Sequence, residues 1–249
     1  DIGQQAFEGC TGLTSITIAD GVEYISDNAF QGCTNLEDIT LPDTLEDVPV
    51  DAFIDTAYYN DPANWGDGCL YIDNWLIKAD SSKMSREYAI KEGTVGIVNG
   101  AFSGCTGLTS VTIPSSVRSI GHVIWDGGAS KGMDGAFERC TSLTSVTIPD
   151  GAKEIGTSAF AGCTSLTSVT IPGSVKDIGE DAFANCKGLT SVTLEDGVER
   201  IVAGAFSGCT SLEEISLPDS LEAIEGAAFS NTAYYNAPSN WEGGCLYID

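Results

Sequence analysis

The sequence has few positive charges, with 11 Lys and Arg against 36 Asp and Glu among 249 residues and a formal net charge of −25. Nucleic acids and anionic membranes are bound through clusters of Lys and Arg. The shortage of positive charge therefore argues against both as partners. Most of the acidic excess is predicted to be a solvated surface, and an acidic face for divalent cations or a basic partner is the alternative.

The chain is also poor in the groups that catalysis needs. It contains one histidine, His122, and no HExxH, paired CxxC or phosphate-binding glycine loop, which zinc and nucleotide chemistry require. A GxSxG sequence occurs at Gly128 to Gly132, but a nucleophile elbow needs a histidine later in the chain, and His122 precedes this one. Neighbouring carboxylates such as Glu213 and Glu214 point to opposite faces of a strand and cannot form a glycosidase pair. We predict no enzyme activity, no cofactor and no metal site.

Long apolar segments are missing as well. No run approaches the roughly 18 apolar residues that a membrane-spanning helix needs, so no part of this chain is predicted to enter a membrane. The chain opens on DIGQQAF and closes on CLYID, each in the middle of an element. We therefore expect it to be a piece of a longer protein, and the absence of a targeting signal says nothing about its location.

What the sequence does contain is a repeat, seen most clearly from Cys140 to Cys163 as CTSLTSVTIPDGAKEIGTSAFAGC. The β-branched residues from Val146 to Ile148 predict a short strand. Pro149 and the Asp150-Gly151 pair predict that this strand ends there. The return half carries its own apolar residues, so neither half can bury its apolar side alone.

The repeat has a period of 23 residues. All nine phenylalanines of the chain lie in Ala-Phe pairs, mostly 23 residues apart, at Phe7, Phe30, Phe53, Phe102, Phe137, Phe160, Phe183, Phe206 and Phe229. A fixed period of this size predicts a solenoid in which each coil covers the apolar face of its neighbour. Seven cysteines hold one repeat position, which predicts buried free thiols that act as small apolar side chains rather than disulfides: Cys10, Cys33, Cys105, Cys140, Cys163, Cys186 and Cys209.

Two interruptions divide this single predicted domain. We expect coils over residues 1–55, an inserted island over 56–84, coils again over 85–230 with a loop insertion at 122–133, and a truncated second island over 231–249. In the first island, Leu70 to Ile72 and Trp75 to Lys78 are predicted to form a β-hairpin around Asp73-Asn74. The island sequence TAYYN recurs 176 residues later, so a longer period is superposed on the short one.

The repeat LTSVTIPGSVKDIGEDAFANC resembles the Treponema pallidum-type leucine-rich repeat of BspA-like bacterial surface proteins. This resemblance implies a leucine-rich-repeat solenoid of right-handed coils, with a curved parallel β-sheet on the concave side and short turns or 3-10 segments on the convex side. It also implies a secreted or cell-surface protein that binds proteins of host or neighbouring cells, such as an adhesin. A structural spacer that presents another domain, or a glycan-binding protein, is the alternative.

The sequence departs from the common leucine-rich repeat at the position that usually holds asparagine. In the coils of this chain that position holds threonine, serine or glycine, at Thr44, Ser116, Gly151, Ser174, Gly197 and Ser220. An asparagine ladder is therefore impossible, and the corner must be made differently.

Two groups of residues are candidates for a binding surface. Alternation along the predicted strands places a ladder of hydroxyls on the open face: Ser110, Thr112, Ser145, Thr147, Ser168, Thr170, Ser191 and Thr193. Aromatic residues of the interruptions could stack on sugars or enter a partner's pocket: Tyr58, Tyr59, Trp65, Trp75 and Trp125. In the simpler interpretation the hydroxyls are only solvated and the island aromatics form a small satellite core. Four aspartates in or near the island could bind calcium, without the spacing of a known loop: Asp61, Asp67, Asp73 and Asp80.

Overall fold

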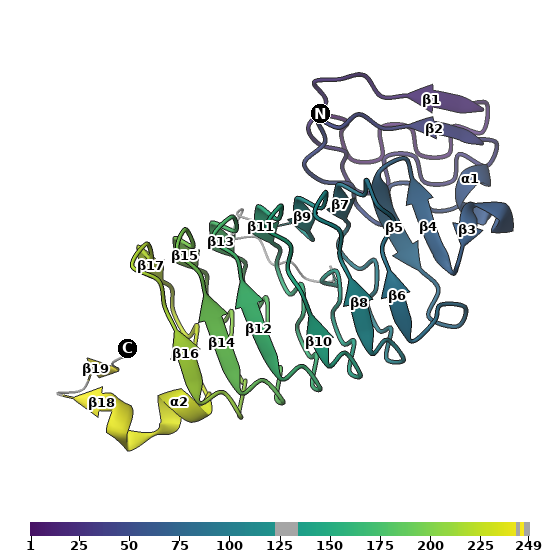
Figure 1. The fold of residues 1–249 in the computed structure, drawn as a ribbon. Helices are drawn as coiled ribbons and strands as arrows, with labels where there is room; N and C mark the ends of the chain where they lie inside the picture. The colour runs from purple at the N-terminus through teal and green to yellow at the C-terminus, as the bar shows by residue number, and fades with distance from the viewer. Residues whose placement is uncertain (123–133, 243–244, 247–249) are drawn as a thin grey trace.

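The computed structural model describes residues 1–122, 134–242 and 245–246. These residues form a parallel β-solenoid with little helix (Figure 1). The predicted fold class is confirmed. Trp125, the GxSxG sequence and nearly all of the predicted insertion lie outside the described residues.

The predicted strands form a first ladder of eight strands, one per coil. These strands pair in parallel and in register, so that Val111 lies beside Val146 and Val169 beside Val192. They fall into three sheets, β1-β2, β6-β8-β10 and β12-β14-β16. Their bounds are β1 Ser15–Thr17, β2 Asp38–Thr40, β6 Glu87–Ala89, β8 Ser110–Thr112, β10 Ser145–Val146, β12 Ser168–Ile171, β14 Ser191–Leu194 and β16 Glu214–Ser216.

A second parallel ladder, which the sequence did not predict, runs through the return half of the coils. Its strands have two residues each because the coil turns again immediately afterwards. The inward residues from β7 to β15, such as Ile155 or Ile178, are fully buried, whereas Ile224 of the last strand is 45% exposed. The outward residue varies from coil to coil. Their bounds are β7 Gly96–Ile97, β9 Ser119–Ile120, β11 Glu154–Ile155, β13 Asp177–Ile178, β15 Arg200–Ile201 and β17 Ala223–Ile224.

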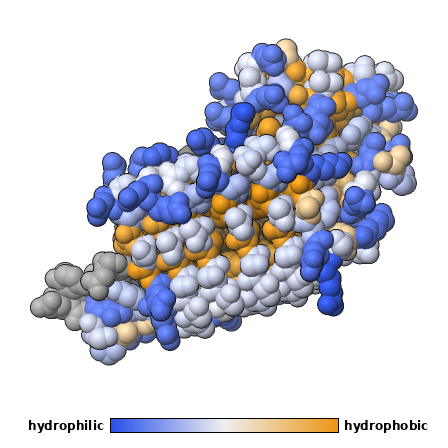
Figure 2. All heavy atoms as spheres, viewed as in Figure 1, coloured by the Kyte–Doolittle hydropathy of each residue, from blue (hydrophilic) through white to orange (hydrophobic). Residues whose placement is uncertain are grey.

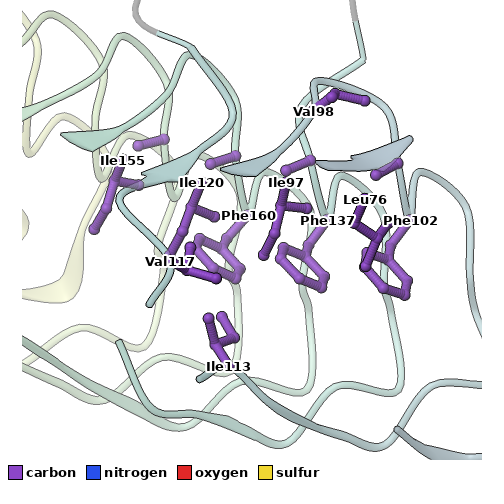
Figure 3. Close-up of a cluster of buried hydrophobic side chains, with 14 of the residues drawn as sticks. Leu76, Ile97, Val98, Phe102, Ile113, Val117, Ile120, Phe137, Ile155 and Phe160 are labelled. Carbon is purple, nitrogen blue, oxygen red and sulfur yellow. The ribbon is translucent and has the colours of Figure 1, made fainter. Parts of the chain in front are cut away.

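The third side of each coil is the turn that carries the Ala-Phe pair, as the resemblance implied. Its backbone bonds the next coil, with the Phe160 N–H donating to the Ala182 carbonyl at 2.7 Å. The phenylalanine rings stack in two runs, Phe7 to Phe53 and Phe102 to Phe229, with centroids 4.7 to 5.4 Å apart and planes within 9°. In Figure 3 three of these rings form a row that faces the inward aliphatic residues of the second ladder.

The cysteines form a free-thiol ladder beside the rings. Among the predicted positions only Cys10, in the first coil, is exposed, and the other six are buried. The Cys163 thiol donates to the Phe137 carbonyl at 3.3 Å, and Cys186 donates to the Phe160 carbonyl at 3.1 Å. Burial raises the pKa of Cys163 to about 12, so the thiol stays protonated at neutral pH.

In several coils a hydroxyl side chain makes the corner where other leucine-rich repeats use asparagine. Ser220 Oγ donates to the Val198 carbonyl at 2.8 Å and accepts from the Gly197 N–H at 2.7 Å. Thr44 makes the same two contacts with the Val22 carbonyl and the Gly21 N–H. A short hydroxyl therefore joins neighbouring coils at Thr44 and Ser220. Two other coils have Gly151 and Gly197 at this position, and the Ser174 hydroxyl has no partner among the described residues.

The island is a capped turn followed by three antiparallel strands, which confirms the predicted hairpin. It consists of α1 Ala57–Asn60, the 3-10 turn η1 Pro62–Asn64, β3 Trp65–Gly66, β4 Cys69–Ile72 and β5 Trp75–Ala79. The second island begins with the same elements, α2 Ala233–Asn236, η2 Pro238–Asn240, β18 Trp241–Glu242 and β19 Cys245–Leu246. In both copies a threonine hydroxyl caps the helix by accepting a backbone hydrogen bond. Thr56 accepts from the Tyr59 N–H, and Thr232 accepts from the Tyr235 N–H.

The island belongs to the solenoid rather than to a loop outside it. Strand β5 pairs in parallel with β7, so β3, β4 and β5 extend the second ladder into a nine-stranded sheet. The Ala79 N–H donates to the Ala101 carbonyl, as the Phe102 N–H does to the Ala136 carbonyl one coil later. The island strand thus completes a coil in which alanine replaces phenylalanine, and the ring stack is broken there.

The coils before and after the island form two blocks at an angle to each other (Figure 1). We call residues 1–55 the N-terminal block and residues 85–230 the C-terminal block. Within the N-terminal block the second ladder is reduced to the isolated bridges Ile2↔Ile25 and Tyr24↔Asp47. Among the described residues no helix is long and apolar enough to cross a membrane.

Candidate binding surfaces

The predicted hydroxyl residues lie together on one face of the first ladder. In-register pairing places Ser110 beside Ser145, Ser168 beside Ser191, and Thr170 beside Thr193, about 4.8 Å apart as in any sheet. Ser110 and Ser191 are half-buried, and the other six are exposed. Figure 2 shows this face as a pale field next to a band of apolar side chains. We call these eight residues the hydroxyl face.

One end of the hydroxyl face is hollowed. A depression of about 300 Å³ lies between β14, β16 and α2, lined by Ser191, Thr193, Glu214, Ser216 and Tyr234 among others. Tyr234 is held there because its N–H donates to the Leu212 carbonyl at 2.7 Å. The second island therefore borders the hydroxyl face with an aromatic side chain.

The first three island aromatics are half-buried and largely satisfied within the island. The Tyr58 hydroxyl donates to the Tyr71 carbonyl at 2.9 Å, and the Trp65 Nε1–H donates to the Tyr59 carbonyl at 2.7 Å. Tyr59 and Trp65 contact each other edge to face, with ring centroids 5.3 Å apart. These contacts are those of a satellite core that holds the hairpin against the coils.

Trp75 is the most buried of the candidate aromatics, with 3% of its surface exposed. Its ring lies against the backbone of Gly96, where an added Cβ would come within 2.2 Å of Cζ3. Among the described residues its Nε1 has no hydrogen-bond partner. Trp75 therefore belongs to the interior edge of the sheet rather than to an open aromatic platform.

The four aspartates considered for calcium are engaged separately or lie apart. Asp61 caps η1 through Ala63, and Asp73 accepts from the Leu41 N–H at 2.6 Å. Asp80 bonds Ser82 and pairs with Lys83 at 3.0 Å. In the described part of the chain no three such residues gather as a metal-binding group.

The two blocks enclose a cleft that sequence reasoning did not find. Its volume is about 710 Å³. One wall comes from the N-terminal block, between Gly21 and Glu46. The other comes from the second-ladder strands of the C-terminal block and the residues that flank them, including Arg118, His122 and Lys153. Trp75 of the island also lines the cleft. The cleft thus joins the predicted island to His122, at the start of the second interruption.

His122 lies at the centre of the contacts between the blocks. Its Nδ1 is 3.4 Å from Glu154 Oε1, and its ring meets Tyr24 of the N-terminal block with centroids 6.2 Å apart. The hydrogen bond to Glu154, with the charges of Asp47 and Glu46, raises the His122 pKa above its ordinary value. Burial raises the pKa of Asp47 to about 6. The hydrogen bond to Glu46 raises that of Tyr24 to about 12.

One sequence signal could have indicated this cleft. The outward position of the second ladder holds a different residue in almost every coil, from Tyr24 and Asp47 through Trp75 and Gly96 to Ser119, Glu154, Asp177 and Arg200. The hydroxyl face, by contrast, repeats serine and threonine. The solenoid fold does not require any particular residue at this outward position. Variation there in an otherwise regular repeat therefore indicates a surface with a role other than folding.

Comparison with known proteins agrees with this architecture. The sequence pattern of the BspA type leucine rich repeat region matches residues 80–127 and 133–239, in six copies, which is more than half of the chain. The chain belongs to this family. No curated protein matches the chain.

Solved structures of bacterial leucine-rich repeat proteins are similar to this BspA-type chain. A leucine rich cell surface protein from Faecalibacterium prausnitzii is 27% identical with a TM-score of 0.53, over 92% of this chain and 72% of that one. A leucine-rich repeat protein from Eubacterium ventriosum is 18% identical with a TM-score of 0.58, over 99% and 84%. The second similarity concerns the fold alone.

Proposed function

We propose that this BspA-type chain is a non-catalytic binding protein of a bacterial surface, and that it contacts a protein of a host or neighbouring cell through its hydroxyl face. The observation that carries the proposal is the in-register field of exposed serine and threonine side chains on a rigid ladder. Hydroxyls both donate and accept hydrogen bonds, and a stacked parallel ladder loses little entropy when a partner binds.

Family membership supports the same direction. Leucine-rich repeat proteins typically bind proteins, and the similar Faecalibacterium protein is described as a cell surface protein. The hollow beside Tyr234 supplies what an interface needs in addition to a flat polar field, namely a depression next to an aromatic side chain.

The test is capture of extracellular proteins by an immobilised chain, with fibrous matrix proteins and intact host cells as the probes. Three outward residues would be changed together, as Thr147→Glu, Thr170→Glu and Thr193→Glu. All three are exposed, so these changes should leave folding intact and reduce capture at least tenfold by crowding like charges on the face.

A matched control uses threonines outside the hydroxyl face. In several coils a threonine directly follows the cysteine at the repeat position, on the turn side of the coil. Thr106, Thr164 and Thr210 are exposed, and the same three changes to Glu there should leave capture unchanged. Equal loss in both variants would attribute binding to net charge and contradict the proposal. No capture of any probe by the wild-type chain would favour the structural spacer, whose support is the rigid double ladder itself.

A further inference from the structure

The cleft between the blocks has two walls of opposite character. The N-terminal wall carries three carboxylates, Glu23, Asp43 and Glu46, and no cationic residue. Glu46 accepts a hydrogen bond from Tyr24, and Asp43 accepts one from Asn74 at 3.2 Å. Within the described residues, none of these three carboxylates forms an ion pair.

The opposite wall offers hydrogen-bond donors. Arg118 and Lys153 line it with exposed side chains that form no ion pair in the described part of the chain. Glu154 and Asp177 on the same wall are already paired, with His122 and Arg200 respectively. The wall therefore presents two cationic donors, while its own carboxylates are occupied.

Trp75 provides a spectroscopic reporter at the cleft. It lines the cleft, is 97% buried, and has an indole Nε1–H without an acceptor among the described residues. Gly96 is what allows the ring to lie in this place, because any larger residue would overlap it.

We propose that the cleft is a binding site for a short peptide segment with a basic side chain. The ammonium or guanidinium group lies against Glu23, Asp43 and Glu46, and the peptide carbonyl oxygens accept from Arg118 and Lys153. A volume of about 710 Å³ falls within the range of roughly 300 to 1,000 Å³ that small-ligand sites occupy. The net charge of −25 attracts a basic segment to this cleft over a longer range.

This site is separate from the hydroxyl face and adds a second contact to the proposed function. Its lining residues belong to the second ladder and the N-terminal block, whereas the hydroxyl face belongs to the first ladder. A peptide titration therefore tests it without any captured protein, and each proposal can fail while the other stands.

The experiment follows the Trp75 indole N–H signal by ¹⁵N NMR, assigned by its loss in Trp75→Phe. The probes are acetyl-Gly-Lys-Gly-amide, the same peptide with glutamine in place of lysine, and n-butylamine. We expect a saturable shift with the lysine peptide and at least tenfold weaker binding of the other two. The glutamine peptide lacks the cation, and n-butylamine lacks the carbonyl oxygens.

Carboxamide variants test the acidic wall. Changing Glu23→Gln, Asp43→Asn and Glu46→Gln together should weaken the lysine peptide at least tenfold. The same change at three exposed carboxylates of the C-terminal block outside the cleft, Glu195→Gln, Glu213→Gln and Asp219→Asn, should leave its affinity within twofold. Equal binding of all three probes, equal weakening in both variants, or no saturable shift in the wild type would each overturn the proposal.

Discussion

Phe137 and Phe160 stack with parallel planes and ring centroids 5.1 Å apart. Both rings are fully buried, and the thiol of Cys163 donates to the Phe137 carbonyl beside them. The spacing of the rings is close to the spacing of the strands, because each ring belongs to one coil and the coils are held at the distance of a parallel ladder. The ring stack is therefore a direct product of the 23-residue period.

Removal of one ring from the middle of this stack should be costly. We expect Phe160→Ala to lower the free energy of unfolding by about 3 to 5 kcal/mol, because the cavity lies between two coils that cannot collapse together. Urea unfolding followed by circular dichroism measures the change. Phe7→Ala is the matched control, since Phe7 is 39% exposed at the first coil and should cost much less. Equal costs for the two variants would contradict the assignment of the stack as the core.

Gly96 should be needed for the place of Trp75. Gly96→Ala puts a Cβ within 2.2 Å of Trp75 Cζ3, and this overpacking should lower the free energy of unfolding by about 1 to 3 kcal/mol. Gly107→Ala is the control, because nothing lies within 4 Å of the position of its Cβ. Thermal melts of both variants give the comparison. In a Trp75→Leu background the cost of Gly96→Ala should become small, and a cost that stays the same would show that the clash is not with the indole.

Stability should fall as the pH rises, because of the contacts between the blocks. The pKa of His122 is raised above its ordinary value of 6.5 in the folded state. The pKa of Asp47 is raised from 3.8 to about 6. Both groups bind protons more tightly in the folded state, so their contribution is complete below the unfolded pKa and is lost as the pH passes the folded one. The loss of stability due to Asp47 occurs between pH 3.8 and about 6, and the loss due to His122 occurs above pH 6.5. Urea unfolding at about pH 5 and about pH 8 should show the lower free energy at the higher pH.

A variant separates the two groups in this pH experiment. Asp47→Asn keeps an acceptor for the Val48 N–H and removes the titration, so the fall between about pH 4 and about pH 6 should become shallower. The fall above it should be reduced but not abolished, because the Asp47 charge is lost while the hydrogen bond to Glu154 still raises the His122 pKa. His122 faces Glu154, Asp47, Glu46 and Tyr24, and all four belong to the same contact between the blocks. Stability that rises over this interval, or an unchanged slope in Asp47→Asn, would contradict the account.

The sequence by itself determined the coil and its core. A residue such as Phe160 or Cys163 recurs every 23 positions, and a regular repeat buries equivalent positions against each other, so the ring stack, the thiol ladder and the hydroxyl face follow from periodicity alone. The hairpin of the first island also follows, because alternation and the Asp73-Asn74 turn are local signals. These predictions need no knowledge of how distant segments meet.

Only the tertiary structure decided what happens where the repeat is interrupted. The two-residue strands of the second ladder are too short for a sequence pattern, since hydrogen bonds to neighbouring coils hold them. Strand β5 replaces part of a coil, which breaks the ring stack and turns the N-terminal block toward the C-terminal block. That turn brings Glu46, Lys153, Trp75 and His122 into the lining of one cleft. Such contacts depend on the angle between two rigid blocks, and no local or periodic signal encodes that angle.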